Sequence, residues 1–95
     1  MFYTFIQNNS GGFWIGPHFV CVECDSLEEA NQIAQSHGVY FDGVKNGKDC
    51  GCCGSRWERA RWVDYLTEEP TYYGSPLKEE KDYKIVYKDG RIVNG

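Results

Sequence analysis

The stretch "DSLEEANQIAQSHG", residues 25–38, carries the clearest structural signal in the chain. Ser26 and Glu29 have the spacing of a capping box, in which two side chains accept hydrogen bonds from free backbone N–H groups at the start of a helix. Gly38 occupies the position where a left-handed residue commonly ends a helix. Between these signals, apolar residues recur at helical spacing: Leu27, Ala30, Ile33 and Ala34. The stretch therefore predicts an amphipathic helix over about residues 26–37.

Segments on both sides of this helix have the composition of β-strands. Residues 2–7 mix aromatic and β-branched side chains in near alternation, and residues 18–24 also alternate between two faces. Residues 13–16 follow a turn-forming Asn/Ser/Gly stretch and can pair back on the first strand. Residues 39–41 predict a short strand that leaves the helix.

The C-terminal half contains one clear strand signal and one ambiguous one. Residues 83–95 predict a hairpin, because Asp89-Gly90 is a dipeptide that two-residue type I′ turns favour. Residues 57–66 fit the spacing of a helix or of a strand, and we favour the strand. The whole pattern predicts an α+β fold, in which a mostly antiparallel sheet of four to six strands carries the helix on one face.

Size and composition set limits on the class of protein. A chain of 95 residues is expected to form a single domain over residues 1–95, because it is too short to bury two separate cores. Its net charge of −4 argues against binding long nucleic acids through their phosphates. Aromatic residues make up 16% of the chain and must pack in the core or face a ligand or partner. With no membrane-spanning run and no signal peptide, the expected location is the cytoplasm.

The loop at residues 42–55 contains three of the five cysteines, Cys50, Cys52 and Cys53. Cys50 and Cys53 have the C-x-x-C-G spacing of half a zinc knuckle, and Cys21 is a candidate fourth ligand. Cys21 and Cys24 could not both bind one metal from a regular strand, because residues three apart point to opposite faces. A compact buried turn is the alternative to zinc, and a catalytic cysteine is the least favoured hypothesis, because the chain has only two histidines to serve as its base.

Four blocks of sequence together resemble a small family of uncharacterised proteins encoded by tailed bacteriophages. In order, the blocks are QNNSGG, VECDSLEEANQIA, YFDGV…DCGCCGSRW and EEP…YG. The resemblance extends from residue 1 to about residue 75. Cys24 departs from it, since the family tends to have a small residue such as Ala there. The resemblance implies a phage origin and the cytoplasm of the bacterial host, and it implies no activity.

A small phage protein with these residues fits an anti-defence role, in which it binds and sequesters a host immune signalling nucleotide without catalysis. Aromatic faces would stack on the base, cations would meet the phosphates, and amides would read the base edges. Such a sponge is expected to be a homo-oligomer, because a small domain builds a deep pocket most easily by sharing walls across an interface. The candidate ligand-binding residues are Asn8, Asn9, Ser10, Trp14, Lys48, Arg56, Trp57, Arg59 and Tyr73.

The alternative hypothesis is an inhibitor that binds a host enzyme or defence protein through exposed aromatic side chains, with the cysteine loop as a structural zinc knuckle. An enzyme is the third choice, since the chain lacks a phosphate-binding glycine motif, a metal-binding histidine cluster and an acid–base pair on one element. If Arg56 and Trp57 bind a ligand at the surface, replacing either with alanine should leave the fold intact.

Overall fold

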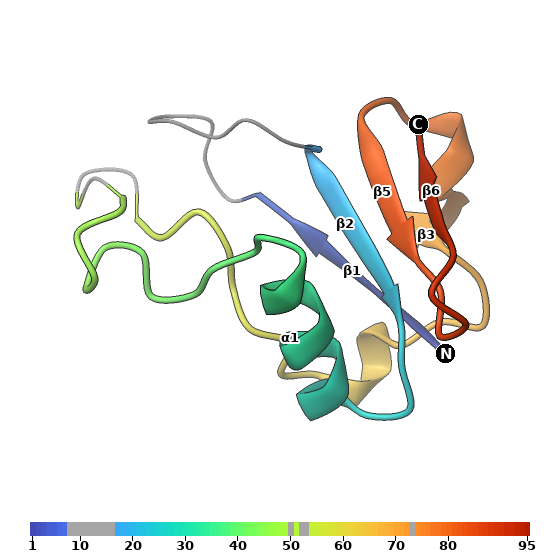
Figure 1. Cartoon of the computed structure of the whole chain (residues 1–95), viewed down its shortest axis with the longest axis horizontal. Coiled ribbons are helices and arrows are strands. Elements are labelled where there is room, and N and C mark those ends of the chain that lie inside the picture. The colour runs from blue at the N-terminus through green and yellow to red at the C-terminus, as the bar shows by residue number, and fades with distance from the viewer. Residues whose placement is uncertain (8–16, 50, 52–53, 73) are drawn as a thin grey trace.

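The computed structural model describes residues 1–7, 17–49, 51, 54–72 and 74–95. These residues form a single unit with one α-helix, two short 3-10 helices and strands in two sheets (Figure 1). The elements in chain order are β1 (Phe2–Ile6), β2 (Phe19–Glu23), α1 (Leu27–Ser36), η1 (Val63–Tyr65), β3 (Thr71–Tyr72), β4 (Ser75–Pro76), η2 (Leu77–Glu79), β5 (Tyr83–Val86) and β6 (Ile92–Asn94).

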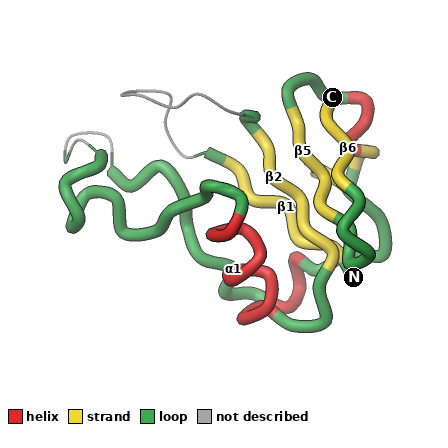
Figure 2. Tube along the Cα trace, viewed as in Figure 1, coloured by secondary structure: helices red, strands yellow, loops and turns green. Residues whose placement is uncertain are grey.

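The main sheet has the strand order β1-β2-β5-β6 (Figure 2). Two of its pairings, β1 with β2 and β5 with β6, are antiparallel, whereas β2 and β5 run parallel. The predicted α+β fold with a mostly antiparallel sheet is confirmed, and the parallel pairing was not expected. A parallel pairing requires a long crossover connection, and residues 24–82 supply it. Within this connection the chain first forms α1 and later pairs with β1 through a bridge between Thr67 and Phe2. It then continues to the other face of the sheet.

The helix is confirmed to within one residue of the prediction at each end. Ser26 Oγ accepts a hydrogen bond from the N–H of Glu29 at 3.1 Å, and Glu29 Oε1 accepts one from the N–H of Asp25 at 3.1 Å. The second bond lies one residue outside the capping box that the sequence predicts. Gly38 has a φ of +96°, as a left-handed helix end requires.

The two faces of the sheet each carry a core. The helix-side core consists of Tyr3, Phe5, Val20, Val22, Cys24, Ala30, Ala34, Val39, Phe41, Trp57, Ala60 and Val86. The second core consists of Phe2, Phe19, Cys21, Leu77 and Ile85. Leu77 belongs to η2 and is fully buried, so the segment after β4 covers the face that α1 leaves open. Fully burying a large apolar side chain stabilises a fold by about 1.5–3 kcal/mol. Covering both faces explains why every residue from Phe19 to Val22 is buried.

Two predicted strands are absent from the described structure. Residues 39–41 continue from the helix end as irregular chain, with Val39 and Phe41 filling the helix-side core. Residues 57–62 have no regular secondary structure and η1 follows at Val63–Tyr65, so both a strand and an α-helix over residues 57–66 are wrong. The side chain of Asn31 forms the two backbone hydrogen bonds that a neighbouring strand would otherwise form with Ala60. Its Oδ1 accepts from the N–H of Ala60 at 2.7 Å, and its Nδ2 donates to the Ala60 carbonyl at 3.3 Å. The predicted strand at residues 13–16 lies outside the described residues.

The C-terminal hairpin is confirmed, but its turn differs from the prediction. Gly90 has a φ of +91°, whereas Asp89 is not among the described residues with positive φ, and a type I′ turn needs both. Instead, the N–H of Gly90 donates to the Tyr87 carbonyl at 3.0 Å and the N–H of Tyr87 donates to the Arg91 carbonyl at 2.9 Å. The connection is therefore a three-residue loop that ends in a left-handed glycine.

Candidate functional site

Arg56 and Trp57, two of the predicted ligand contacts, are buried. The Arg56 side chain is 2% exposed, and its Nη1 donates to Gln7 Oε1 at 2.7 Å. Its Nε donates to the Tyr40 hydroxyl at 3.2 Å. Trp57 is 1% exposed and lies in the helix-side core. Both side chains therefore pack inside the fold and not on its surface, where the sequence placed them.

A buried carboxylate organises the loop that leads to the cysteines. Asp49 Oδ1 accepts a hydrogen bond from the Tyr40 hydroxyl at 2.8 Å, and its Oδ2 accepts one from the N–H of Arg56 at 2.8 Å. Desolvation, reinforced by the bond to Asp49, raises the pKa of Tyr40. A Cβ added to Gly43 would lie 1.8 Å from Asp49 Oδ2, so only glycine leaves room for this carboxylate. Lys48 lies over the Tyr40 ring, with its Nζ 4.8 Å from the ring centre.

Arg59 lies apart from this network. Its guanidinium is 4.8 Å from the centre of the Phe41 ring, and its Nη2 is 3.0 Å from Asp42 Oδ2 in an exposed ion pair. A hollow of about 120 Å³ lies beside Arg59 and Arg61. Pockets for small ligands usually begin at about 300 Å³, so this hollow is too small for a nucleotide.

Cys21, the predicted fourth zinc ligand, is fully buried in the second core, and the other three predicted ligands lie outside the described residues. Burial raises the pKa of the Cys21 thiol to about 12, and a hydrogen bond with Thr4 lowers it in part. Cys24 lies in the helix-side core, so the two cysteines face opposite sides of the sheet as their spacing predicts. Among the described residues, no three His, Cys, Asp or Glu side chains are grouped to hold a metal.

We expect Cys21 to resist alkylation in the folded protein, because a buried thiol must be exposed by local or global opening before it reacts. With iodoacetamide near pH 8, its labelling should be at least about 100-fold slower in the native state than in guanidinium. Peptide mass spectrometry measures the rate at this cysteine alone. Native labelling as fast as in the denatured chain would contradict its buried position.

The remaining predicted site residues lie outside the described part of the chain. They are Asn8, Asn9, Ser10, Trp14, Cys50, Cys52, Cys53 and Tyr73.

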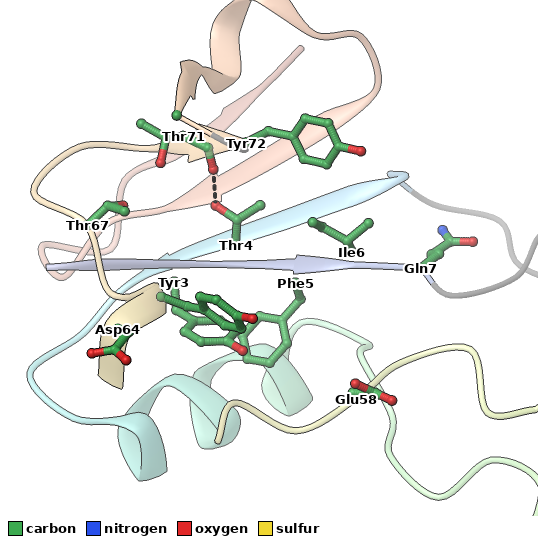
Figure 3. A pocket seen from close by; sticks show the side chains of 12 residues that line it. Tyr3, Thr4, Phe5, Ile6, Gln7, Glu58, Asp64, Thr67, Thr71 and Tyr72 are labelled. Carbon is green, nitrogen blue, oxygen red and sulfur yellow. Dashed lines mark hydrogen bonds between the residues drawn. The ribbon is translucent and has the colours of Figure 1, made fainter. Parts of the chain in front are cut away.

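A groove of about 650 Å³ runs along the outer edge of β1 (Figure 3). Tyr3 and Phe5 point to the α1 side of this strand, whereas Thr4 and Ile6 point to the side of β3. One wall, the acidic wall, consists of Glu58, Asp64 and Tyr65. The other wall, the threonine-tyrosine wall, consists of Thr71, Tyr72 and Gly74.

Hydrogen bonds attach the chain after η1 to β1 and so set the walls of the groove. The N–H of Phe2 donates to the Thr67 carbonyl at 2.6 Å, and the N–H of Thr67 donates to the Phe2 carbonyl at 2.9 Å. The Thr4 hydroxyl donates to the Thr71 carbonyl at 2.8 Å. The described lining includes the carboxylates of Glu58 and Asp64 and no lysine or arginine.

Three large apolar side chains next to the groove are exposed to solvent, and Tyr65 among them also belongs to the acidic wall. Trp62, Val63 and Tyr65 are 62%, 67% and 63% exposed. They lie on and next to η1, and we call them the exposed apolar turn. Two large side chains of the second core, Phe19 and Leu77, are by contrast 6% and 0% exposed.

The family described as Domain of unknown function (DUF7296) matches residues 1–94. The chain belongs to the DUF7296 family. No curated protein and no solved structure matches it. The match includes the C-terminal hairpin, which the resemblance seen in the sequence did not cover. In the described part of this DUF7296 chain, no helix is long and apolar enough to cross a membrane.

Sequence reasoning missed the groove of this DUF7296 domain, because two parts of the chain that are far apart, residues 3–7 and residues 58–74, build it. It also missed Gln7, Tyr40 and Asp49 as partners of Arg56. One signal was available in "RWVDY", residues 61–65, where three large apolar side chains are interspersed with two charged ones outside any clearly predicted element.

Proposed function

We propose that this DUF7296 domain is a phage-encoded accessory protein that binds a host protein in the bacterial cytoplasm and acts without catalysis. The phage setting rests on the resemblance of its sequence blocks. The observation that carries the binding function is the exposed apolar turn. Clusters of exposed aromatic side chains beside a concave surface are typical of the energetic centres of protein interfaces.

The fold holds the exposed apolar turn in place. The N–H of Tyr65 donates to the Trp62 carbonyl at 3.1 Å, and the N–H of Leu66 donates to the Val63 carbonyl at 3.1 Å. Leu66 packs against the helix-side core, and the next residue pairs with β1. A surface held in this way loses little conformational freedom on binding, which favours affinity.

Sequestration of a nucleotide has less support among the described residues. The large groove has an acidic lining, which repels phosphates, and the cations proposed for them lie elsewhere. Arg56 is buried, while Lys48 and Arg59 lie over two different aromatic rings. A binding surface for a protein therefore accounts for more of the described structure than a nucleotide pocket does.

The double substitution Trp62→Ala/Tyr65→Ala should weaken binding to the host partner by about 30-fold or more, since interface hot spots contribute about 2 kcal/mol or more. The partner is first captured from lysate of the bacterial host, then identified, purified and titrated by calorimetry. The matched control is Ile92→Ala/Val93→Ala on β6, where the two side chains are 43% and 36% exposed at the far edge of the sheet. This control should bind as the parent protein does.

Equal affinity of the parent protein and the Trp62→Ala/Tyr65→Ala variant would overturn the proposed function. Native mass spectrometry of the protein purified from cells provides the second readout. A retained adduct of nucleotide size would instead support sequestration.

A further inference from the structure

We infer that the outer edge of β1 binds an extended segment of the partner as an added strand, and that this segment carries basic side chains at every second position. The inference rests on the proposed function, because it names which part of a partner protein this groove recognises. Main-chain hydrogen bonds provide the affinity in this mode of recognition, and side-chain contacts on the two faces provide the specificity.

The backbone of β1 offers hydrogen-bonding groups to such a strand. Phe2 exchanges both of its backbone bonds with Thr67, so its N–H and C=O point away from β2. In an antiparallel pair this direction alternates along the strand, so the N–H and C=O groups of Thr4 and Ile6 also point outward. Among the described residues, none forms a backbone hydrogen bond with these outward groups. β1 is therefore an edge strand that is capped at Phe2 and offers donors and acceptors beyond it.

The groove has the shape that an added strand requires. Its floor is the β1 edge, and its two walls rise on opposite faces of the sheet (Figure 3). Successive side chains of a strand point to opposite faces. An added strand would therefore place one set of side chains against the acidic wall and the other set against the threonine-tyrosine wall.

The charge of the groove determines which side chains the bound partner segment should carry. Glu58 and Asp64 stand on the acidic wall, and the described lining of the groove contains no lysine or arginine. Glu58 also borders the smaller hollow beside Arg59 and Arg61, so Asp64 is the carboxylate farther from these cations along the chain. Lysine or arginine at alternate positions would meet these carboxylates, while apolar or small side chains would meet Tyr72. A second copy of this chain is a poorer occupant, because its net charge is −4 and its own edge has the same acidic wall.

Three peptides test the charge and the backbone contacts, with binding followed by NMR titration of the full-length protein. The basic probe is an acetylated and amidated heptapeptide of alternating lysine and valine, and its counterpart replaces each lysine with glutamate. We expect the basic probe to shift the Thr4 and Ile6 amide signals and slow their hydrogen exchange. The acidic counterpart should bind at least about 10-fold more weakly, and equal binding of the two peptides would overturn the charge argument.

Backbone N-methylation separates strand addition from simple charge attraction, because it removes donors without changing charge. Residues of an added strand whose N–H groups face β1 all point their side chains to one wall. Methylation at the valines should abolish binding in an antiparallel complex and be tolerated in a parallel one. Methylation at the lysines should have the reverse effect. Loss with one methylated peptide is the expected result, and full retention with both would overturn strand addition.

A protein variant provides the matching test. Glu58→Lys/Asp64→Lys should weaken the basic probe by at least about 10-fold, because both carboxylates are exposed and their replacement leaves the core intact. Glu28→Lys/Glu79→Lys is the control, since both acids are exposed, neither is part of the lining, and the net charge changes by the same amount. If both variants weaken peptide binding equally, the effect comes from the net charge of the protein and not from the groove, and the β1 site is overturned.

These results also separate the inference from the proposed function. If the peptides fail while partner binding still depends on Trp62 and Tyr65, only strand addition is wrong. If the peptides bind at β1 while partner binding ignores the exposed apolar turn, the proposed function fails and the β1 site stands.

Discussion

Trp57→Ala is expected to lower the free energy of unfolding by about 3–5 kcal/mol, because it removes the largest side chain of the helix-side core and leaves a cavity. The indole lies in one core with α1, β1 and β2, so the cavity would open between the helix and the sheet. A domain of this size is commonly stable by about 5–15 kcal/mol, so this loss is a large part of the total.

Urea denaturation followed by far-UV circular dichroism measures this loss without relying on the fluorescence of the replaced residue. Trp62→Ala is the matched control, because the same side chain five positions later is 62% exposed. The control should change the free energy of unfolding by less than about 0.5 kcal/mol. A similar small change for Trp57→Ala would show that the indole does not fill the core.

Arg56→Ala is also expected to destabilise the protein, by about 3–5 kcal/mol, because it leaves the buried carboxylate of Asp49 without its cation. The side chains of the two residues are 2% and 4% exposed, with Arg56 Nε 4.0 Å from Asp49 Oδ1. The substitution also removes the hydrogen bonds that link Arg56 to Gln7 and Tyr40. Gln7, which follows β1, would thereby lose the connection to Tyr40 that Arg56 provides.

A double-mutant cycle with Asp49→Ala measures the interaction between the two side chains. The Arg56→Ala/Asp49→Ala variant should lose less stability than the sum of the single variants, by about 0.5–3 kcal/mol. Arg59→Ala is the control, since its ion pair with Asp42 is exposed and should contribute at most about 1 kcal/mol. If the stability loss of the double variant equals the sum of the losses of the two single variants, Arg56 and Asp49 act independently.

Both expected results reverse what the sequence indicated, namely that Arg56 and Trp57 can be replaced without loss of the fold. Clustered arginines and a tryptophan in a glycine-rich setting have the composition of a ligand site. Composition does not distinguish Arg56, which is 2% exposed, from Arg59, which is 45% exposed. The difference depends on Gln7 and Asp49, which reach Arg56 from other segments of the chain.

The elements that the sequence predicted correctly are those with local causes. The helix from Leu27 to Ser36 follows from its cap, its apolar spacing and Gly38, all within fourteen residues. The hairpin of β5 and β6 follows from alternation and a left-handed glycine. Side-chain alternation along β2 correctly placed Cys21, and Cys24 just after the strand, on opposite faces of the sheet.

The elements that the sequence did not predict depend on partners that are distant along the chain. Residues 57–66 fit two periodicities, and their conformation is decided by Asn31, which forms two hydrogen bonds with Ala60. The parallel pairing of β2 with β5 depends on where residues 24–82 cross the sheet. The groove requires residues 58–74 to lie along the edge of β1, more than fifty positions away in the chain.

Local sequence therefore determined the helix, the hairpin, the strand faces and the α+β class, because backbone preference and side-chain periodicity act within a few residues. Tertiary structure decided which arginine and which tryptophan are buried, which strand edge lacks a full partner strand among the described residues, and which carboxylates line that edge. Those properties depend on contacts between residues such as Phe2 and Thr67, which are brought together only by the folded chain.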